Sequence, residues 1–348
     1  MRLDRGVVVL HNTPRSFNGA STQAWPESDL GVMLQVAMVS AALDQLGLPH
    51  GAVGICRLSD IHPALSGRAE QVVFNLVEEL ADCGQNTAGV PTLIGALGKS
   101  CTGSGASCLS LCADKWQTKA ALRARGVPTP AGLVVPRGRD GLAGDGLAGQ
   151  VPDGPLIVKP LGAHASEGID SGSVVAGPGP ELSAAVQRIH EQYEKAALVE
   201  QFIDGREVNV SLLQSGRDVR VLPLAEIDFT TLAPGLPRIV SYAAKWLPGT
   251  AEHHGTQRRI PAPLPPALAD RVRRLALLAW EAVGCRGYAR IDLRIDRNDR
   301  PFVLEVNCNP DISPDSGFIA ALAAAGISPA RFVRTVLTDV LEEVGEML

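Results

Sequence analysis

Ala289-Arg290-Ile291-Asp292-Leu293-Arg294-Ile295-Asp296 is followed, after the turn Arg297-Asn298-Asp299-Arg300, by Phe302-Val303-Leu304-Glu305-Val306-Asn307. Both segments alternate apolar and polar side chains, which is the pattern of half-buried strands. The polar turn between them is short enough to join antiparallel neighbours. The stretch therefore predicts a β-hairpin with one polar face.

The predicted hairpin gathers polar side chains onto one surface. Arg290 and Asp292 share a face of the first strand, and Glu305 and Asn307 share a face of the second. Carboxylate and amide oxygens suit Mg²⁺, which usually binds through one or two carboxylates plus nucleotide phosphates. The alternative is a solvated hairpin face with surface ion pairs, because exposed charge on one side of an antiparallel sheet is ordinary.

Composition indicates an ordinary globular protein. The 348 residues are 45% hydrophobic and 20% charged, with a formal net charge of −5, which predicts two or three subdomains with sizeable cores. The mild acidity argues against a nucleic-acid binder. No window approaches the roughly 18 uninterrupted apolar residues of a membrane span, and the apolar run at 7–10 is too short for a signal-peptide core. We expect a cytoplasmic protein with neither nucleic acid nor membrane as a partner.

The cysteines favour the same compartment. There are seven, at 56, 83, 101, 108, 112, 285 and 308, with no CxxC pair. An odd number without such pairs fits a reduced cytosolic protein better than a disulfide scaffold. Cys108 and Cys112 are four apart and can face one another on a helix. Without a nearby His pair they make a weak zinc site, and small buried residues are the preferred interpretation.

The N-terminal part alternates strands and helices. Short apolar runs predict strands at 7–10, 52–56 and 72–76. Ser28 is expected to cap a helix from Asp29 to about Leu46, which Gly47 closes. This βαβ pattern predicts a parallel sheet with helices on its faces.

The remainder continues with mixed elements around a Gly- and Asp-rich surface loop at 137–154. Helices are predicted at 114–125, 181–194, 267–283, 317–325 and 329–347, strands at 156–159, 174–175, 198–202, 208–213 and 219–227, and a long polar segment at 228–266.

Two further segments contain residues that could bind a nucleotide. Lys159 ends a strand before a Gly- and Ser-bearing loop at 160–169, and such a pair can hold phosphate oxygens through the ammonium and the backbone N–H groups. It is not a Walker loop, because GxxxxGK[ST] does not occur. Residues 200–203 can offer backbone hydrogen bonds to a purine while Glu207 accepts from a ribose hydroxyl. Taken alone, Lys159 is equally well explained as a surface lysine before a turn. Residues 200–207 are equally well explained as a strand and a turn with a solvated end.

Taken in order, short segments across most of the chain resemble the ATP-grasp superfamily and, within it, the D-alanine–D-alanine ligase-like branch. They are residues 73–76, 114–119, 126–130, 157–160, 199–207, 244–246, 290–292, 304–310 and 315–317. The resemblance implies an α/β protein of α+β subdomains: an N-terminal parallel-sheet unit at 1–112, a central ATP-grasp unit at 113–203 and a C-terminal ATP-grasp unit at 204–348.

The activity implied is an ATP-dependent carboxylate–amine ligase. It would work through an acyl phosphate and release ADP and phosphate, with small-molecule carboxylate and amine substrates. The implied cofactors are ATP and two Mg²⁺ ions, for which Mn²⁺ can substitute, and a homodimer is one assembly open to such a chain. A true D-alanine–D-alanine ligase and a non-catalytic ATP-binding protein are the alternatives.

The resemblance also assigns nucleotide-site roles to individual residues. It implies phosphate contacts from Lys115, Lys159 and Lys245, a loop over the triphosphate at 166–169 that includes Ser166 and Gly168, adenine contacts from Glu200 and Ile203, and a ribose contact from Glu207.

The catalytic and substrate positions follow in the same way. Asp292, Glu305 and Asn307 match the Mg²⁺ ligands, and Arg290 matches the arginine that steadies the acyl phosphate and the tetrahedral intermediate. Substrate positions are matched by Ser316 and Gly317, near the acceptor carboxylate, and by Glu27, at the first substrate's amino group.

Three departures from the family fall at the amino-acid positions. Ala165 stands where the ligases have the first serine of the mobile loop, Trp246 stands for a tyrosine, and Asp311 stands for a glycine. Lost hydroxyls weaken selection for a substrate ammonium. We therefore expect a substrate other than D-alanine. Asp311 either contacts a cationic acceptor or orders its own loop.

Overall fold

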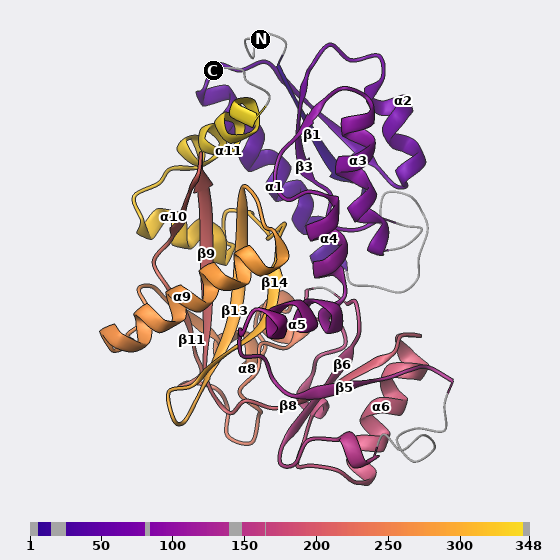
Figure 1. Ribbon diagram of the computed structural model, residues 1–348, viewed down its shortest axis with the longest axis vertical. Helices are drawn as coiled ribbons and strands as arrows, with labels where there is room; N and C mark the ends of the chain where they lie inside the picture. Colours follow the sequence, from indigo (N-terminus) through magenta and orange to yellow (C-terminus); the bar gives the residue numbers. More distant parts are fainter. Residues whose placement is uncertain (1–5, 15–25, 81–83, 139–147, 164, 344–348) are drawn as a thin grey trace.

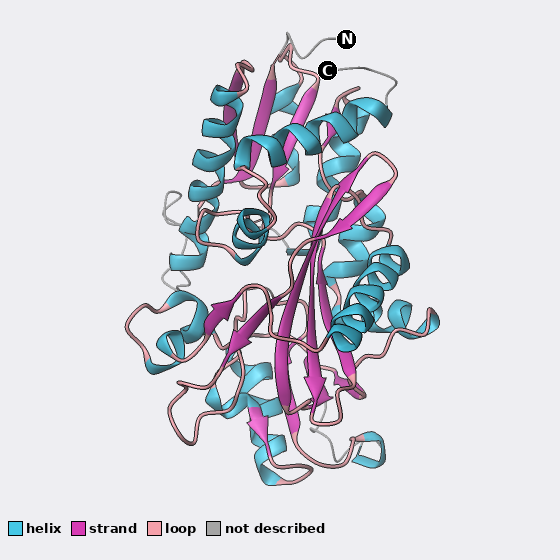
Figure 2. Ribbon diagram, turned by 90° about the vertical axis from the view of Figure 1, so that its left-hand side faces the viewer, coloured by secondary structure: helices cyan, strands magenta, loops and turns pink. Residues whose placement is uncertain are grey.

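Three β-sheets organise the protein (Figures 1 and 2). A computed structural model describes residues 6–14, 26–80, 84–138, 148–163 and 165–343. The sheets take their strands from successive parts of the chain, at 7–101, 132–201 and 205–307. The predicted boundaries after residues 112 and 203 fall between these sheets and stay a prediction.

The first sheet is parallel, in the order β2-β1-β3-β4. Its strands are β1 (Val7–Asn12), β2 (His50–Ile55), β3 (Val72–Leu76) and β4 (Ser100–Cys101). Helices α1 (Pro26–Gln45), α2 (Ile61–Leu65) and α3 (Gly89–Ala96) accompany it. β1 and β3 are buried along their whole length, as expected for a parallel sheet covered on both faces. The predicted parallel α/β sheet is confirmed.

The first helix differs from the prediction at its start. It begins at Pro26, so Ser28 lies inside the helix rather than at its N-cap. Proline suits the first turn of a helix, because its missing N–H is unpaired there in any case and its φ is already helical.

The second sheet is antiparallel, in the order β5-β8-β6-β7. Its strands are β5 (Gly132–Val135), β6 (Leu156–Pro160), β7 (Val174–Val175) and β8 (Ala197–Gln201). Helix α6 (Pro180–Gln192) covers one face and packs Leu182, Val186 and Ile189 against the strands. Figure 1 shows this unit below the rest of the molecule.

The third sheet is also antiparallel, in the order β12-β11-β9-β13-β14, with β10 paired to β9. Its strands are β9 (Gly205–Ser215), β10 (Asp218–Val221), β11 (Ala225–Asp228), β12 (Gln257–Arg259), β13 (Tyr288–Asp296) and β14 (Pro301–Asn307). Helix α9 (Pro266–Val283) packs its apolar side on this sheet.

The third sheet corrects two predictions. The single strand expected at 219–227 is two strands, β10 and β11, both paired with β9. Pro223 lies between them, and its missing N–H breaks the ladder. The polar segment at 228–266 contains α7 (Tyr242–Trp246), α8 (Ala251–His254) and β12.

The C-terminal helices α10 (Gly317–Ala324) and α11 (Pro329–Glu343) return to the N-terminal unit. They share one apolar core with α1 and the first sheet, in which Tyr288, Phe318 and Phe332 form a ring cluster. Figure 1 shows α11 beside α1. Among the described residues, no single helix is long and apolar enough to cross a membrane. In the same described ranges, α10 and α11 taken together reach that length and composition, but they are bent by 100°.

Candidate active site

The β13–β14 hairpin places the predicted metal ligands side by side. Arg290 lies opposite Asn307, and Asp292 lies opposite Glu305. The neighbouring strand β9 adds Asn209 opposite Asp292, and its Nδ2 donates to Asp292 Oδ1 at 2.7 Å. The structure thus brings all four hairpin residues together.

Asp292 is the centre of this face. Arg290 donates to both of its oxygens, from Nε at 2.8 Å and from Nη2 at 2.9 Å. Asn307 Nδ2 donates to Asp292 Oδ2 at 3.0 Å and lies 3.4 Å from Glu305 Oε1. Two carboxylates and an amide are the hard oxygen donors that Mg²⁺ prefers. The amide of Asn307 must turn for its oxygen to face a cation, and a cation competes with Arg290 for Asp292.

Lysines surround the second carboxylate, Glu305. Lys115 Nζ lies 3.5 Å from Glu305 Oε2 and donates to the Ala163 carbonyl at 2.5 Å. Burial alone would raise the pKa of Glu305, but Lys115, Lys245 and Lys159 together lower that pKa below its usual value. Glu305 therefore stays anionic at neutral pH.

Lys245, on α7, is a partly buried lysine whose charge interacts with Glu305, Asp292 and Arg290. Burial and the Arg290 guanidinium lower the pKa of Lys245, while Glu305 and Asp292 oppose that shift. The predicted residues Lys115, Lys245 and Arg290 thus supply positive charge around Glu305 and Asp292. The positive groups of this site attract an anionic ligand, and the two carboxylates can bind a cation that accompanies it.

A buried ion triad lies beside this group. Helix α5 (Lys115–Ala124), capped by Asp114, carries Lys119, whose Nζ lies 2.8 Å from Glu200 Oε1. Lys159 Nζ lies 2.5 Å from Glu200 Oε2. The carboxylate of Glu200, a residue of the predicted adenine-contacting strand, is thus held between two ammonium groups.

Lys119 was given no role of its own by sequence reasoning. It is fully buried and donates to the Leu304 carbonyl at 2.8 Å. The available signal was its place on the same helical side as Leu122, which is also fully buried. Its bonds tie the second sheet to β14 of the third.

Glu207 and Ile203, the expected ribose and adenine contacts, meet at Arg294. Arg294 Nη1 lies 3.0 Å from Glu207 Oε2, and its Nε donates to the Ile203 carbonyl at 2.6 Å. Burial raises the pKa of Glu207, against the effect of Arg294. Their nucleotide roles stay predictions.

The predicted phosphate loop is fastened to α7. Ser166 Oγ donates to the Val240 carbonyl at 2.9 Å, and Trp246 Nε1 donates to the Ala165 carbonyl at 3.0 Å. Ala165 and Ser166 have φ values of 55° and 63°, a conformation that costs free energy in residues other than glycine and is common at ligand-binding loops. Two of the three departures from the family, Ala165 and Trp246, therefore contact each other. Gly168 has φ 73°, and a Cβ there would lie 2.5 Å from Pro160.

Helix α1 approaches this loop with its N-terminal part. A Cβ on Gly31 would lie 3.7 Å from the Trp246 ring. Glu27 lies one turn earlier in α1, but its side chain is outside the described residues. Its substrate role stays a prediction.

Asp311 orders the loop after β14. Its Oδ1 accepts from the Ser313 backbone N–H at 2.7 Å, and its Oδ2 accepts from the Ser313 hydroxyl at 3.0 Å. This geometry fits the loop-ordering alternative. Contact with a cationic acceptor stays a prediction.

The predicted acceptor residues begin helix α10. Ser316 caps it by accepting from Ile319 N–H at 3.3 Å. A Cβ on Gly317 would lie 3.5 Å from Arg258 Nε, and Arg258 Nη1 donates to the Asp315 carbonyl at 3.3 Å. Sequence reasoning missed Arg258, because it lies in the segment treated as a polar loop.

Glu78 is another residue that was missed. It follows the carboxyl end of β3, where ligands commonly bind to parallel sheets. Gln35 of α1 donates to Glu78 Oε1 at 2.6 Å and accepts from the Ile312 N–H at 3.2 Å. The first sheet is thereby joined to the Asp311 loop.

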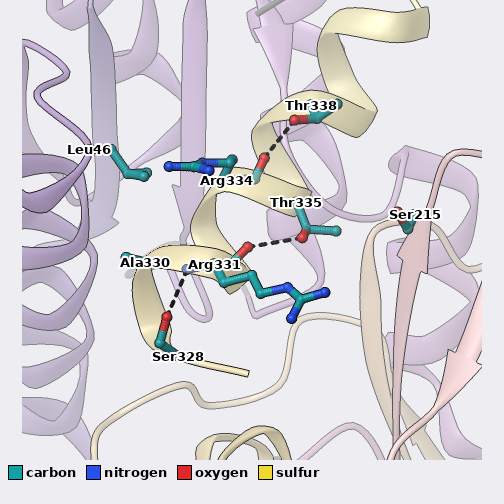
Figure 3. Close-up of a pocket in the computed structure, with 8 residues that line it drawn as sticks. All are labelled: Leu46, Ser215, Ser328, Ala330, Arg331, Arg334, Thr335 and Thr338. Carbon is teal, nitrogen blue, oxygen red and sulfur yellow. Dashed lines mark hydrogen bonds between the residues drawn. The ribbon is translucent and has the colours of Figure 1, made fainter. Parts of the chain in front are cut away.

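A separate surface pocket lies at the far end of β9 (Figure 3). Its lining residues are Leu46, Ser215, Ser328, Ala330, Arg331, Arg334, Thr335 and Thr338. Ser215 lies six residues beyond Asn209 along β9, so at about 3.3 Å per residue it is roughly 20 Å from the hairpin face. We do not include it in the site.

Comparisons with known proteins find relatives over most of the chain. The family model described as D-ala D-ala ligase C-terminus matches residues 150–338, more than half of the chain. A D-alanine–D-alanine ligase of Stutzerimonas stutzeri is 32% identical over 332 residues, covering 94% of this chain and 93% of the relative. The uncharacterised protein y4sG of Sinorhizobium fredii is 32% identical over 317 residues, 90% of this chain and 88% of its own.

The fold has a match among solved structures. The crystal structure of D-alanine–D-alanine ligase from Bacillus anthracis complexed with ATP superposes with a TM-score of 0.72 at 22% identity. The match covers 97% of this chain and 98% of that one. The predicted ATP-grasp fold is confirmed.

Proposed function

The chain belongs to the D-alanine–D-alanine ligase family of ATP-grasp enzymes, and we propose that it joins a small carboxylate to an amine through an acyl phosphate. The products are the amide, ADP and phosphate. The observation that carries the proposal is the joint presence of two carboxylates, Asp292 and Glu305, with three cations, Lys115, Lys245 and Arg290.

That arrangement suits phosphoryl transfer between anions. The substrate carboxylate attacks the γ-phosphorus of ATP, and the bond from that phosphorus to the ADP oxygen breaks. Lys115 and Lys245 reduce the repulsion between the two anions. Mg²⁺ bound by Asp292, Glu305 and Asn307 would neutralise further charge on the phosphate oxygens.

The second half-reaction uses Arg290. The amine attacks the acyl carbon, the phosphate leaves with the electron pair of the broken C–O bond, and the amine loses a proton. Arg290 is held in place by its two bonds to Asp292, which leaves guanidinium N–H groups for the oxyanion. Removing one such stabiliser typically costs about 10²- to 10³-fold in rate.

We further propose an amino-acid-like acceptor and a first substrate other than D-alanine. Arg258 beside Gly317 offers a guanidinium to an acceptor carboxylate, as bidentate arginines commonly do. The Trp246–Ala165 bond replaces the two hydroxyls expected near the first substrate. A less polar first substrate suits that change.

A substrate screen tests the proposal. Pairs of carboxylates and amines are incubated with ATP and Mg²⁺, and ADP, AMP, phosphate and pyrophosphate are quantified together. We expect ADP and phosphate in equal amounts, dependent on both substrates. Stoichiometric AMP and pyrophosphate with a productive pair would contradict the acyl-phosphate mechanism.

A further inference from the structure

Four cysteines from three distant segments converge beneath the active-site hairpin. Cys108 and Cys112 lie on α4 (Ala106–Ala113), Cys285 follows α9, and Cys308 follows β14. The Cys108 sulfur lies 4.0 Å from that of Cys112 and 3.8 Å from that of Cys285. The sulfurs of Cys108, Cys112 and Cys308 all lie within 4.8 Å of one another.

These separations are close to those of a metal–thiolate tetrahedron. Zn–S bonds of about 2.3 Å at tetrahedral angles place the sulfurs about 3.8 Å apart. Cys285 adjoins the three-sulfur group through Cys108, and its sulfur must move closer to the other two to complete the tetrahedron. All four cysteines are free thiols in the structure, so their sulfurs are available as ligands.

The surroundings favour a structural site. Cys108, Cys285 and Cys308 are buried in the apolar core of the third sheet, and Cys112 is partly buried. Thiolates are tolerated in such a core only with a compensating cation. Closed four-coordinate sites with cysteine ligands are the usual form of structural zinc, whereas catalytic zinc keeps an open position.

We propose that Cys108, Cys112, Cys285 and Cys308 bind one Zn²⁺ ion as a structural tetrathiolate site. Each thiol loses its proton to solvent on binding, and no redox change occurs. The ion would fasten α4 to the end of β14, where Cys308 directly follows Asn307. This function is independent of the proposed ligase chemistry.

Metal analysis of the full-length protein is the first test. The protein is expressed in zinc-supplemented medium, purified without chelators and measured by inductively coupled plasma mass spectrometry. We expect about one zinc per chain, as in other closed sites. Protein that contains no zinc, and takes up none after reduction and titration, would overturn the proposal, as would iron or copper in place of zinc.

Matched variants identify the ligands. Cys112→Ser removes the ligand that is least buried. We expect zinc affinity to fall by about a hundredfold or more, because each of four ligands contributes about a quarter of the binding free energy of a typical structural zinc site. Cys56→Ser, at a partly buried cysteine outside the cluster, should keep full zinc. Equal zinc affinity in the two variants, measured by competition with a chelator, would overturn the assignment.

Cobalt provides a readout that does not depend on affinity or activity. Co²⁺ in the reduced protein should give thiolate-to-metal charge-transfer absorption and tetrahedral d–d bands, and both should weaken in Cys112→Ser. A spectrum of octahedral Co²⁺ without charge-transfer bands would contradict a thiolate site.

Discussion

Replacing Glu200 by glutamine should strongly destabilise the protein. Glu200 is the anion between Lys119 and Lys159, and the side chains of these three residues are 1%, 0% and 9% exposed. Removing one partner of a buried ion pair typically costs about 3–5 kcal/mol, because the remaining charge is left uncompensated. The Glu200→Gln variant leaves two such ammonium groups, so we expect a loss in that range.

An exposed ion pair serves as the control for the buried one. Arg137 and Glu194 form an ion pair of 2.9 Å, but their side chains are 52% and 72% exposed. Glu194→Gln should therefore unfold close to wild type, since exposed pairs contribute little. Urea unfolding followed by circular dichroism gives both free energies. A Glu200→Gln variant as stable as Glu194→Gln would refute the reasoning.

The free energy of unfolding of the same two proteins, wild type and Glu200→Gln, should also differ in its pH dependence. Burial lowers the pKa of Lys119 to about 8, against the attraction of Glu200. At pH values between the folded-state pKa of Lys119 and its higher unfolded-state pKa, the unfolded chain holds the proton on Lys119 more tightly than the folded protein does. The contribution of Lys119 to the free energy of unfolding therefore rises with pH in this range. Without Glu200 the pKa should fall further. The stability gap between Glu200→Gln and wild type should therefore narrow as the pH rises from 7 to about 9.

Three further predictions concern the reaction. Glu305→Gln should fold normally yet lose nearly all turnover, because the proposed metal site loses an anionic ligand. Steady-state ADP release checks this, and wild-type turnover at saturating Mg²⁺ would count against the assignment. Arg290→Lys should lower kcat by about 10²- to 10³-fold, because lysine cannot reproduce the bidentate bond to Asp292; an unchanged kcat would exclude oxyanion stabilisation. Asp311→Asn should keep acceptor preference, since an amide oxygen can still accept from the Ser313 N–H; altered preference in the substrate screen would instead indicate contact with the acceptor.

Local patterns predicted the elements that hold the proposed site. Alternation at 289–296 and 302–307 predicted the hairpin. Its short turn alone would place Asp292 opposite Leu304, and the β-bulge that places Asp292 opposite Glu305 was not predicted. The apolar run at 72–76 matched β3 to the residue. Such features depend on neighbours in the sequence and on side-chain period.

Contacts between distant segments were not predictable in this way. Lys119 and Leu304 are 185 positions apart, and Cys108 and Cys285 are 177 apart. Their meeting depends on how the sheets pack, which no local period encodes. Arg258 was missed because a three-residue edge strand is too short to show alternation.

An isotope-transfer experiment tests the central claim most directly. A carboxylate substrate from the screen, labelled with heavy oxygen in its carboxyl group, is converted to the amide, and the released phosphate and nucleotide are examined by mass spectrometry. If the carboxylate attacks the γ-phosphorus, one labelled oxygen must appear in inorganic phosphate and none in ADP. Label in AMP, or phosphate free of label, would contradict the acyl-phosphate ligase.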